Sequence, residues 1–499
     1  MGAGNRTRVN QAVCRLATVV AVDERACVNC HKCISVCPVK LCNYASGDYV
    51  RVNSDLCIGC GRCLSACTHD ARHGVDDTAA FFQDLQQKQP MVAVVAPSVV
   101  SNFPEHYLQL NGWLKSQGIE AIFDVSFGAE LAAKTCAEHI RQEDPDFVIA
   151  SPCPAIVTYL QIYQPDLLPY LAPADSPVVH TVKMISQNFP EYRGHRVVTL
   201  TPCFAKKREI DEAGVAGYNV TFDSLAHHFD CNSIDLNDYP EVPFLGPKAG
   251  EAILLPVPGG LAATMKQWVP NLEQVTRTVE GVGQVYDYLE TLPQVLKDHR
   301  QDAPLLVDCL SCEYGCSLGP AANHRCVPPD TAAARIKKRH ERIRSCENED
   351  THSIDRRISP YWEPGLFVRH FRDLSGNVRL ESPEPELKRR VFAAMLKYTD
   401  EDMFDCAACG YSCCDTMALA IHNRLNRPEN CHHYLIKERD RAKHELSTYQ
   451  KYLERLIVQL EQKNEELTSH QERLEQKVAH RTADLARAKE QAEEAMFCF

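Results

Sequence analysis

Cysteine is the residue type with the most chemistry to offer in this sequence, and most of its copies come in tight groups. The 499-residue chain holds 25 cysteines. Two groups lie within residues 27–67, further ones are spread over residues 153–316, and a third group occupies residues 406–431. The start of the chain lacks the apolar core of a secretion signal. Dense cysteine in such a chain indicates metal ligation instead of disulfides.

The first two groups repeat one spacing, Cys-x-x-Cys-x-x-Cys-x-x-x-Cys, over residues 27–37 and 57–67. This spacing resembles bacterial ferredoxins, in which three close thiolates hold one 4Fe–4S cluster and the fourth ligates the other cluster. We expect one cluster on Cys27, Cys30, Cys33 and Cys67, and a second on Cys57, Cys60, Cys63 and Cys37. Thr68 stands where the first run has Pro38, which leaves the ligands intact. A zinc site is the alternative, but zinc motifs usually offer two separated pairs.

Composition excludes several classes of protein. The net charge is −12, which argues against nucleic acid as the main partner because phosphate binding needs clustered Lys and Arg. No apolar run approaches the roughly 20 residues that span a bilayer. Apolar content of 44% and charged content of 24% are ordinary for globular protein. We expect a cytoplasmic protein without a membrane span.

The elements that must position the cysteines can be predicted from apolar runs. Short β-branched runs predict buried strands at residues 91–97, 146–151 and 195–203. Segments with helical spacing, such as residues 129–142, separate them, which favours parallel strands with crossover helices in an α/β core. The predicted domains are a ferredoxin-type α+β domain (19–80), the α/β domain (88–320), a connector (321–395), a small helical 4Fe–4S domain (396–435) and a coiled coil (436–499).

Four segments of the α/β domain carry the remaining candidate chemistry. They are ASPCPA (150–155), TPCFAKKRE (201–209), PGGLA (258–262) and LSCEYGCSLG (310–319). A lone cysteine is more often a buried structural thiol than a ligand. Here, however, two of the cysteines follow predicted strands and every segment contains Gly or Pro, as a cluster buried at the ends of strands requires.

Together these segments resemble the H-cluster motifs of iron-only (FeFe) hydrogenases, in family order after a ferredoxin module. The likeness includes DVSFGAE (124–130) and covers roughly residues 88–320. It implies a hydrogenase large-subunit-like core in which Cys153, Cys203, Cys312 and Cys316 hold a 4Fe–4S cluster. Cys316 would bridge to a diiron subsite that carries CO and CN ligands. Lys206 would face a cyanide, and Glu209 would match a carboxylate of the proton path. The spacing to Cys316 favours Cys312 over Cys309 as the ligand.

The departures from the family pattern are equally informative. Active hydrogenases have a proton-passing cysteine where this chain has Pro152, which cannot take or give a proton. Thr201 and Leu310 replace methionines of the second and fourth motifs. These changes should slow turnover without removing cluster ligands. They resemble the sensory or regulatory branch of the family, in which the domain detects hydrogen or redox state.

A third cysteine cluster lies near the C-terminal end of the chain. Its pattern, Cys-x-x-Cys-x-x-x-x-Cys with a further cysteine seventeen residues on, looks like the small 4Fe–4S domain of electron-transport and corrinoid proteins. On that resemblance Cys406, Cys409, Cys414 and Cys431 are ligands, and Cys413 is not. Zinc remains the alternative. His432 and His433 are expected to be solvated. The remaining single cysteines are expected to be unliganded thiols (Cys14, Cys42, Cys136, Cys231, Cys326, Cys346 and Cys498).

The last 64 residues predict a coiled coil. Leucines recur every seven residues at Leu446, Leu453, Leu460, Leu467 and Leu474, and the spacing restarts at Val478 after a four-residue stutter. A parallel homodimer is the favoured interpretation, and a single amphipathic helix lying on the body is the alternative. Residues 481–495 resemble the helix that leads into histidine-kinase dimerisation domains. A signalling domain or partner protein is the expected recipient of the output.

The sequence therefore predicts a hydrogenase-like sensor of hydrogen or redox state. Electrons would pass between 4Fe–4S clusters and external donors or acceptors, and the coiled coil would transmit the signal. Enzymatic activity, if present, would be FeFe hydrogenase chemistry at low turnover. The alternatives are a catalytic ferredoxin-linked hydrogenase and a non-catalytic iron–sulfur assembly or redox protein of the same fold.

Overall fold

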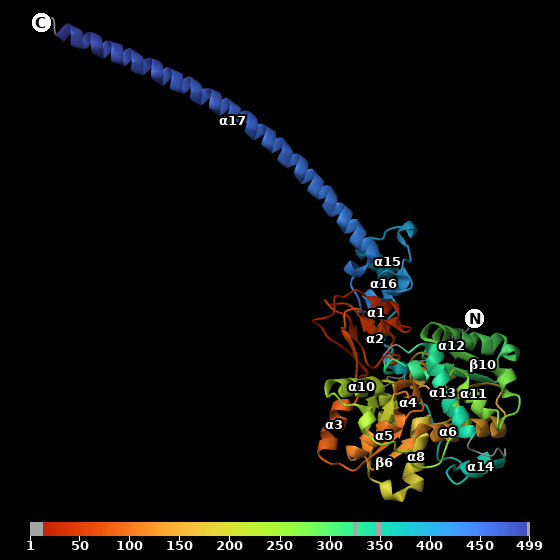
Figure 1. Cartoon of the computed structure of the whole chain (residues 1–499). Coiled ribbons are helices and arrows are strands. Elements are labelled where there is room, and N and C mark those ends of the chain that lie inside the picture. The colour runs from red at the N-terminus through yellow and green to blue at the C-terminus, as the bar shows by residue number, and fades with distance from the viewer. Residues whose placement is uncertain (1–12, 324–326, 346–351, 497–499) are drawn as a thin grey trace. The chain divides into compact units, whose positions relative to one another are not determined.

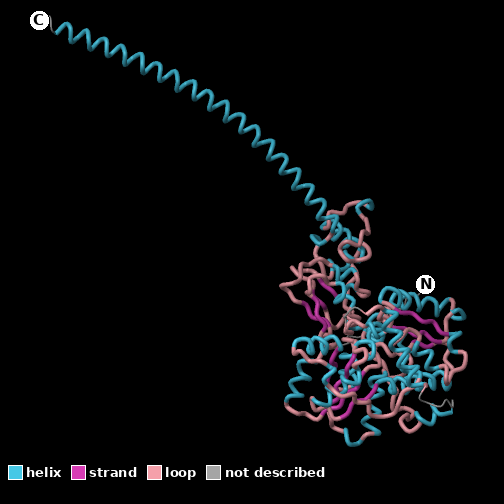
Figure 2. The backbone as a smooth tube through the Cα atoms, in the orientation of Figure 1, coloured by secondary structure: helices cyan, strands magenta, loops and turns pink. Residues whose placement is uncertain are grey.

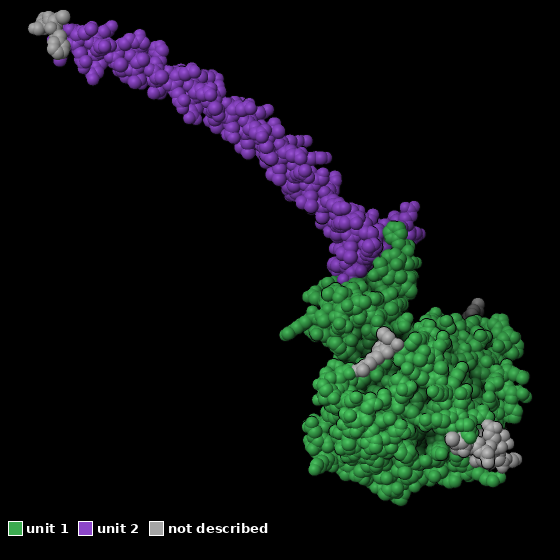
Figure 3. Space-filling view, in the orientation of Figure 1, with its two compact units in different colours: residues 1–391, 403–427 green, residues 392–402, 428–499 purple. Residues whose placement is uncertain are grey.

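The computed structural model describes residues 13–323, 327–345 and 352–496. The chain forms two compact units (Figure 3). The first comprises Met1–Val391 with Met403–Arg427, and the second comprises Phe392–Asp402 with Pro428–Phe499. Among the described helices, none is both long and apolar enough to cross a membrane. Cys326, Cys346 and Cys498 lie outside the described residues.

The core of the first unit is a parallel four-stranded sheet in the order β6-β5-β8-β9. Its strands are β5 (Met91–Val95), β6 (Ala121–Asp124), β8 (Arg196–Thr201) and β9 (Tyr218–Thr221). Every residue of β5 is buried, which explains its unbroken apolar sequence, because a parallel sheet is covered on both faces. The helices along this part of the chain are α3 (Thr78–Gln86), α4 (Val99–Asn102), α5 (Tyr107–Ser116), α6 (Val125–Glu143), α8 (Pro177–Asn188), α9 (Lys206–Ala213) and α10 (Phe222–Cys231) (Figure 1).

A second parallel sheet has the order β10-β11-β7. It consists of β7 (Val148–Ile149), β10 (Thr276–Glu280) and β11 (Leu306–Leu310), and α7 (Pro154–Tyr163), α11 (Gly260–Met265) and α12 (Val282–Asp298) belong to the same stretch of chain. The predicted strands, their parallel direction and the helix over 129–142 are confirmed. They occupy two sheets, however, because the run at 146–151 pairs with β11 and not with β5 or β8.

The N-terminal module contains two antiparallel two-stranded sheets and two short helices. β1 (Val20–Val22) pairs with β4 (Arg72–Gly74), and β2 (Asn43–Tyr44) pairs with β3 (Arg51–Val52). The helices are α1 (Lys32–Ser35) and α2 (Arg62–Ala66), and each follows the second cysteine of its run. The module therefore has the small, twice-repeated fold expected of a ferredoxin-type domain.

Buried contacts join this module to the central domain. Arg208 at the start of α9 donates to the backbone carbonyls of Ala17 and Ser54, each at 2.9 Å, and to that of Cys57. Gly61 adopts a left-handed φ of +74°, and a Cβ there would lie 2.3 Å from Pro320 Cβ. Glycine is thus required where the second cysteine run meets the fourth hydrogenase-like motif.

Residues 321–391 do more than connect domains. They contain α13 (Pro329–Arg344) and α14 (His352–Ile358), and α15 (Pro385–Ala394) begins near their end. Ile336, Ile358 and Phe367 are buried in the hydrophobic core that surrounds the four-stranded sheet. Arg339 of α13 also forms an ion pair with Asp124 at the end of β6.

The second unit is dominated by α17 (His432–Met496), a single unbroken helix (Figure 2). It starts four residues before the predicted coiled coil. The five predicted heptad leucines are 48–69% exposed. Residues 403–427 of the predicted 4Fe–4S domain, including α16 (Cys414–His422), belong to the first unit.

Candidate functional site

Four cysteines converge on one cavity of about 80 Å³ in the central domain. Cys153 follows β7 and caps α7, Cys203 follows β8, and Cys312 follows β11. Cys316 opens a short 3₁₀ helix four residues later. The carboxyl ends of parallel strands are where open α/β sheets place their ligands. The cavity brings together the four cysteines that the sequence singled out.

The turn before Cys316 depends on glycine. Gly315 has φ of +83°, and a Cβ at this position would lie 2.2 Å from the carbonyl oxygen of Pro256. The same carbonyl accepts a 2.8 Å hydrogen bond from the backbone N–H of Cys316. The close approach of the two loops therefore fixes where the Cys316 thiol enters the cavity.

The cavity wall is mainly apolar, apart from its thiols, three hydroxyl groups and one cation. Ala96, Val125, Val178, Leu255 and Leu310 form part of the wall. Burial raises the pKa of Cys203 to about 11 and that of Cys316 to about 12, and the neighbouring thiols add to both shifts. Such thiols stay protonated unless a metal supplies positive charge, since metal binding displaces the protons.

The donor set fits an iron–sulfur cluster. It offers four sulfur ligands and no carboxylate, and soft thiolates select iron–sulfur clusters, zinc or copper(I). In the part of the chain that the structure describes, no three His, Cys, Asp or Glu side chains converge closely enough to hold a metal ion. The four thiols border a volume instead of a point, which suits a group of several irons.

Lys206 is the cationic side chain at the cavity wall. Its Nζ donates to Glu209 Oε2 at 2.5 Å and to the carbonyl oxygen of Pro152 at 3.4 Å. Glu209 also accepts from Ser176 at 2.6 Å and from Arg369 at 3.2 Å. Burial alone would raise the pKa of Glu209, but Lys206 and Arg369 together lower it below its ordinary value. Glu209 is therefore an ionised anchor that orients Lys206, and it does not itself line the cavity.

Pro152 also lines the cavity, at the position where the resemblance expects a proton-carrying thiol. The other lining residues, apart from the four cysteines and Lys206, are apolar residues, glycine, and the hydroxyl-bearing Ser98, Thr201 and Ser311. Ser98 Oγ is buried without a hydrogen-bond partner. The wall therefore holds no carboxyl or imidazole group that could pass a proton at neutral pH.

The structure also brings the two ferredoxin-type cysteine sets together. Cys27, Cys30, Cys33 and Cys67 line one small cavity, which we call the outer site. The second set, which we call the inner site, consists of Cys37, Cys57, Cys60 and Cys63. Burial is the main cause of the raised pKa of Cys60, and the other three cysteines of the set lie close enough to raise it further. The inner site is next to the central cavity, since Cys60 also contributes to the raised pKa of Cys312.

Sequence reasoning missed two residues at these sites. Arg72 donates to Cys33 Sγ at 3.0 Å, from a buried position on β4. Cys42, expected to be an isolated thiol, is buried with its Sγ 3.7 Å from Cys37 Sγ. Neither belongs to the cysteine spacing, so no local pattern marks them. Cys309 is fully buried within β11 and does not line the cavity, which is consistent with a structural thiol.

The C-terminal cysteines are divided between the two compact units. Cys406, Cys409 and Cys414 belong to the first unit and Cys431 to the second. Their joint ligation of a cluster stays a prediction. Within the first unit, the 406–414 loop packs on the ferredoxin-type module, where Lys40 Nζ donates to the carbonyl of Gly410 at 3.3 Å.

The expectation that His432 and His433 are both solvated is half wrong. His432 is exposed, but His433 is buried. The Nε2 of His433 lies 2.9 Å from the carbonyl oxygen of Leu396 and 3.6 Å from Asp402. His433 therefore anchors the start of α17 within the second unit.

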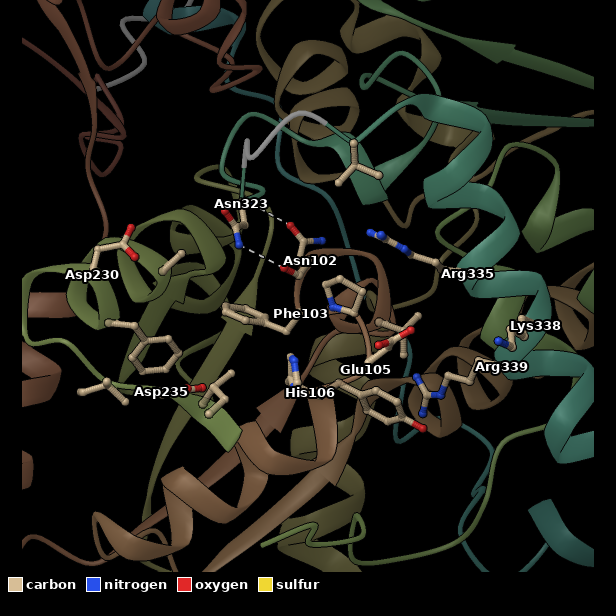
Figure 4. Close-up of a pocket in the computed structure, with 18 of the residues that line it drawn as sticks. Asn102, Phe103, Glu105, His106, Asp230, Asp235, Asn323, Arg335, Lys338 and Arg339 are labelled. Atoms are coloured by element: carbon tan, nitrogen blue, oxygen red, sulfur yellow. Dashed lines mark hydrogen bonds between the residues drawn. The ribbon is translucent and has the colours of Figure 1, made fainter. Parts of the chain in front are cut away.

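A larger cavity of about 750 Å³ lies elsewhere in the first unit (Figure 4). One wall is the basic face of α13, with Arg335, Lys338 and Arg339, and Asn102 and Asn323 hydrogen-bond to each other at its edge. None of the predicted ligands lines it. Its walls carry both basic and acidic side chains, so its charge does not define a ligand.

Comparison with known proteins identifies the class. Residues 89–320 match the family model described as "Iron only hydrogenase large subunit, C-terminal domain", and residues 26–72 match a "4Fe-4S dicluster domain". The domain at residues 89–320 therefore belongs to the iron-only hydrogenase family.

Solved FeFe-hydrogenase structures are similar to this chain only at low identity. A structure of FeFe-hydrogenase HydA1 from Chlamydomonas reinhardtii is 16% identical, covers 59% of this chain and 99% of its own, and has a TM-score of 0.47. A structure described as revealing stepwise H-cluster assembly is 14% identical, covers 58% of this chain and 98% of its own, and has a TM-score of 0.45. The family assignment rests on the domain matches.

Proposed function

We propose that the chain is an iron–sulfur sensor of hydrogen or redox state. Cys153, Cys203, Cys312 and Cys316 would hold a 4Fe–4S cluster, with Cys316 as the bridge to a diiron subsite. When bound, that group would supply the metal at which hydrogen reacts. The inner and outer ferredoxin-type sites would hold one 4Fe–4S cluster each, and Cys406, Cys409, Cys414 and Cys431 a further one.

Pro152 is the observation that carries the proposal of a sensor. It occupies the cavity wall at the position expected for a proton carrier, and its carbonyl accepts from Lys206. A relay needs a group that both takes and gives a proton. Lys206 is engaged by an ionised carboxylate, so it is suited to hold an anionic ligand by charge. Slow proton delivery favours signalling over turnover.

Proximity of the cysteine sites supports electron relay. The inner site borders the central cavity at Cys60 and Cys312. On its other side, Cys409 and Cys37 both lie near the ammonium group of Lys40 and act on its pKa. The inner site is therefore the junction through which external electron donors or acceptors would communicate with the central cluster.

The exposed leucine stripe of α17 supports a homodimer as the output form. Five leucines at seven-residue spacing are about half or more exposed, and a second copy of the helix would bury them. A signalling domain or partner would receive the output. A chain rich in ligand thiolates suits the reducing cytoplasm, which is where we place it.

The infrared spectrum of anaerobically reconstituted protein loaded with a diiron precursor tests this function. The account expects bands from metal-bound CO and CN that shift when hydrogen is added. The matched control is Cys316→Ala, which should retain the ferredoxin-type clusters but lose these bands. Absence of bands in wild-type protein with intact 4Fe–4S clusters would remove hydrogen as the signal.

A catalytic ferredoxin-linked hydrogenase is the second candidate. The observation in its favour is Lys206, which lines the cavity as a cation suited to a cyanide ligand. Hydrogen evolution from a reduced dye would separate the two candidates. Turnover comparable with that of established hydrogenases would favour the enzyme over the sensor.

A further inference from the structure

The ferredoxin-type module holds a ninth cysteine, Cys42, in addition to its eight predicted ligands, and this ninth cysteine is buried. Cys42 ends a 3₁₀ helix (Lys40–Cys42) and is 1% exposed. Its Sγ lies 3.7 Å from Cys37 Sγ, and the thiol is close enough to Cys57 for the two to influence each other's pKa. Cys37 and Cys57 belong to the same inner site. Cys42 therefore sits between two predicted ligands of one cluster.

Hydrogen bonds to the side chain and the backbone of Cys42 orient its thiol. The side-chain amide of Asn43 donates to Cys42 Sγ at 3.4 Å. The backbone carbonyl of Cys42 accepts from Asn53 N at 2.8 Å, which holds the residue in place. Because the sulfur already accepts from Asn43, its own S–H is free to donate toward Cys37 or Cys57.

The outer site has a different donor in a comparable place. There the guanidinium of Arg72 donates to Cys33 Sγ at 3.0 Å. A ligand sulfur becomes more negative when its cluster gains an electron, so a donor to that sulfur stabilises the reduced form more than the oxidised form. The outer site thus has a buried cation that donates to a predicted ligand sulfur, and the inner site has a buried thiol beside a predicted ligand sulfur.

We propose that Cys42 donates an S–H hydrogen bond to a ligand sulfur of the inner cluster and so raises the reduction potential of that cluster. The proposal rests on the cluster ligation of the proposed function. Cys42 keeps its proton, and no bond forms or breaks. Its role is to set how readily the inner cluster, at the junction between the central cavity and the 406–414 loop, accepts an electron.

Anaerobic redox titration of the full-length reconstituted protein, followed by electron paramagnetic resonance of the ferredoxin-type clusters, tests the proposal. Cys42→Ala should shift the inner cluster to a more negative potential, with an about two- to tenfold smaller ratio of reduced to oxidised cluster at a fixed potential. Cys42→Ser keeps a donor of nearly the same size and should remain closer to wild type. Cys136→Ala is the matched control, because Cys136 is equally buried but lies on α6, outside the module.

Infrared spectroscopy gives a second readout. Wild-type protein should show an S–H stretch that shifts when the inner cluster is reduced, and Cys42→Ala should lack that band. An unchanged potential in Cys42→Ala with full iron content would overturn the proposal. Loss of the inner cluster in both Cys42 variants would also overturn it, since Cys42 would then be a ligand. A wild-type protein that binds no cluster in this module would instead reject the proposed ligation itself.

Discussion

At the scale of single residues, the wall of the central cavity has thiols suited to ligate a cluster but has no titratable group at position 152 to carry a proton. Cys153, Cys203, Cys312 and Cys316 surround the cavity, while Pro152 removes a titratable group from its wall. Glu209, expected from the resemblance to match a carboxylate of the proton path, is bound to Lys206, Ser176 and Arg369. Lys206 and Arg369 lower the pKa of Glu209, which favours the ionised form that accepts these hydrogen bonds.

His180 provides a pH prediction at this scale. It is fully buried, 3.1 Å from Thr135 Oγ1 and stacked on Phe367, and burial lowers its pKa to about 3. The unfolded chain binds a proton at this histidine below its ordinary pKa of about 6.5, whereas the folded chain does not. Stability is therefore lost as pH falls below about 6.5, by roughly 1.4 kcal/mol between pH 7.5 and 5.5.

Anaerobic thermal unfolding at the two pH values checks this prediction. His180→Gln should be less stable than wild type at pH 7.5 but should lose less stability on going to pH 5.5. An equal pH dependence in the two proteins would show that His180 does not carry the effect.

The sequence singled out the cysteines that the structure brings together, through regular spacing in the ferredoxin-type runs and through motif resemblance in the central domain. The outer set and the central set each line one cavity, as the spacing and the motifs indicate. Cys42 and Arg72 could not be predicted. They reach the ligand sulfurs through the pairing of β2 with β3 and of β1 with β4, which no local pattern reveals.

At the scale of elements, buried strands were predictable and their partners were not. The runs at 91–97, 146–151 and 195–203 all form strands, since long apolar β-branched runs suit a covered parallel sheet. Their division between two sheets depends on the pairing of β7 with β11 and of β11 with β10, which apolar runs alone do not specify. The contribution of residues 321–391 to the hydrophobic core could not be predicted either, because the segment is rich in charged residues.

Arg208 carries a prediction about how the elements are joined. Arg208→Met should remove the donor to the carbonyls of Ala17, Ser54 and Cys57, at a cost of roughly 1–3 kcal/mol for the buried bond to Cys57 and less for the two partly buried ones. Hydrogen exchange should then speed up in residues 54–60. The matched control is Arg62→Met, because the Arg62–Glu313 pair is long at 3.8 Å and half exposed. Equal exchange in both variants would contradict a clamping role for Arg208.

At the scale of the whole molecule, the central and ferredoxin-type cysteine sites lie in one compact unit and the long helix lies in the other. The first unit contains the central, inner and outer cysteine sites, and the second contains Cys431 and α17. The helix was predictable from its seven-residue spacing. The division of the four C-terminal cysteines between the two units could not be predicted, because all four lie within 26 residues of the sequence.

The exposed leucine stripe gives a prediction about assembly. Leu460→Asp should weaken homodimerisation about tenfold or more, since a charge would replace a buried core position of the coiled coil. Light scattering across a concentration series measures this, with Gln462→Asp, outside the stripe, as the control. A wild-type protein that stays monomeric at high concentration would reject the dimer.

We infer that Pro152 occupies the position of a proton carrier in a hydrogenase-like cavity and thereby limits hydrogen turnover. Hydrogen turnover of reconstituted protein, measured with a reduced dye for wild type, Pro152→Cys and Pro152→Ala, tests it most directly. We expect low turnover in wild type and in Pro152→Ala. Pro152→Cys should raise turnover roughly 100-fold or more, because a positioned acid–base group typically accelerates proton transfer by that amount. High turnover in wild type, or no difference between the two variants with the metal sites equally loaded, would contradict it.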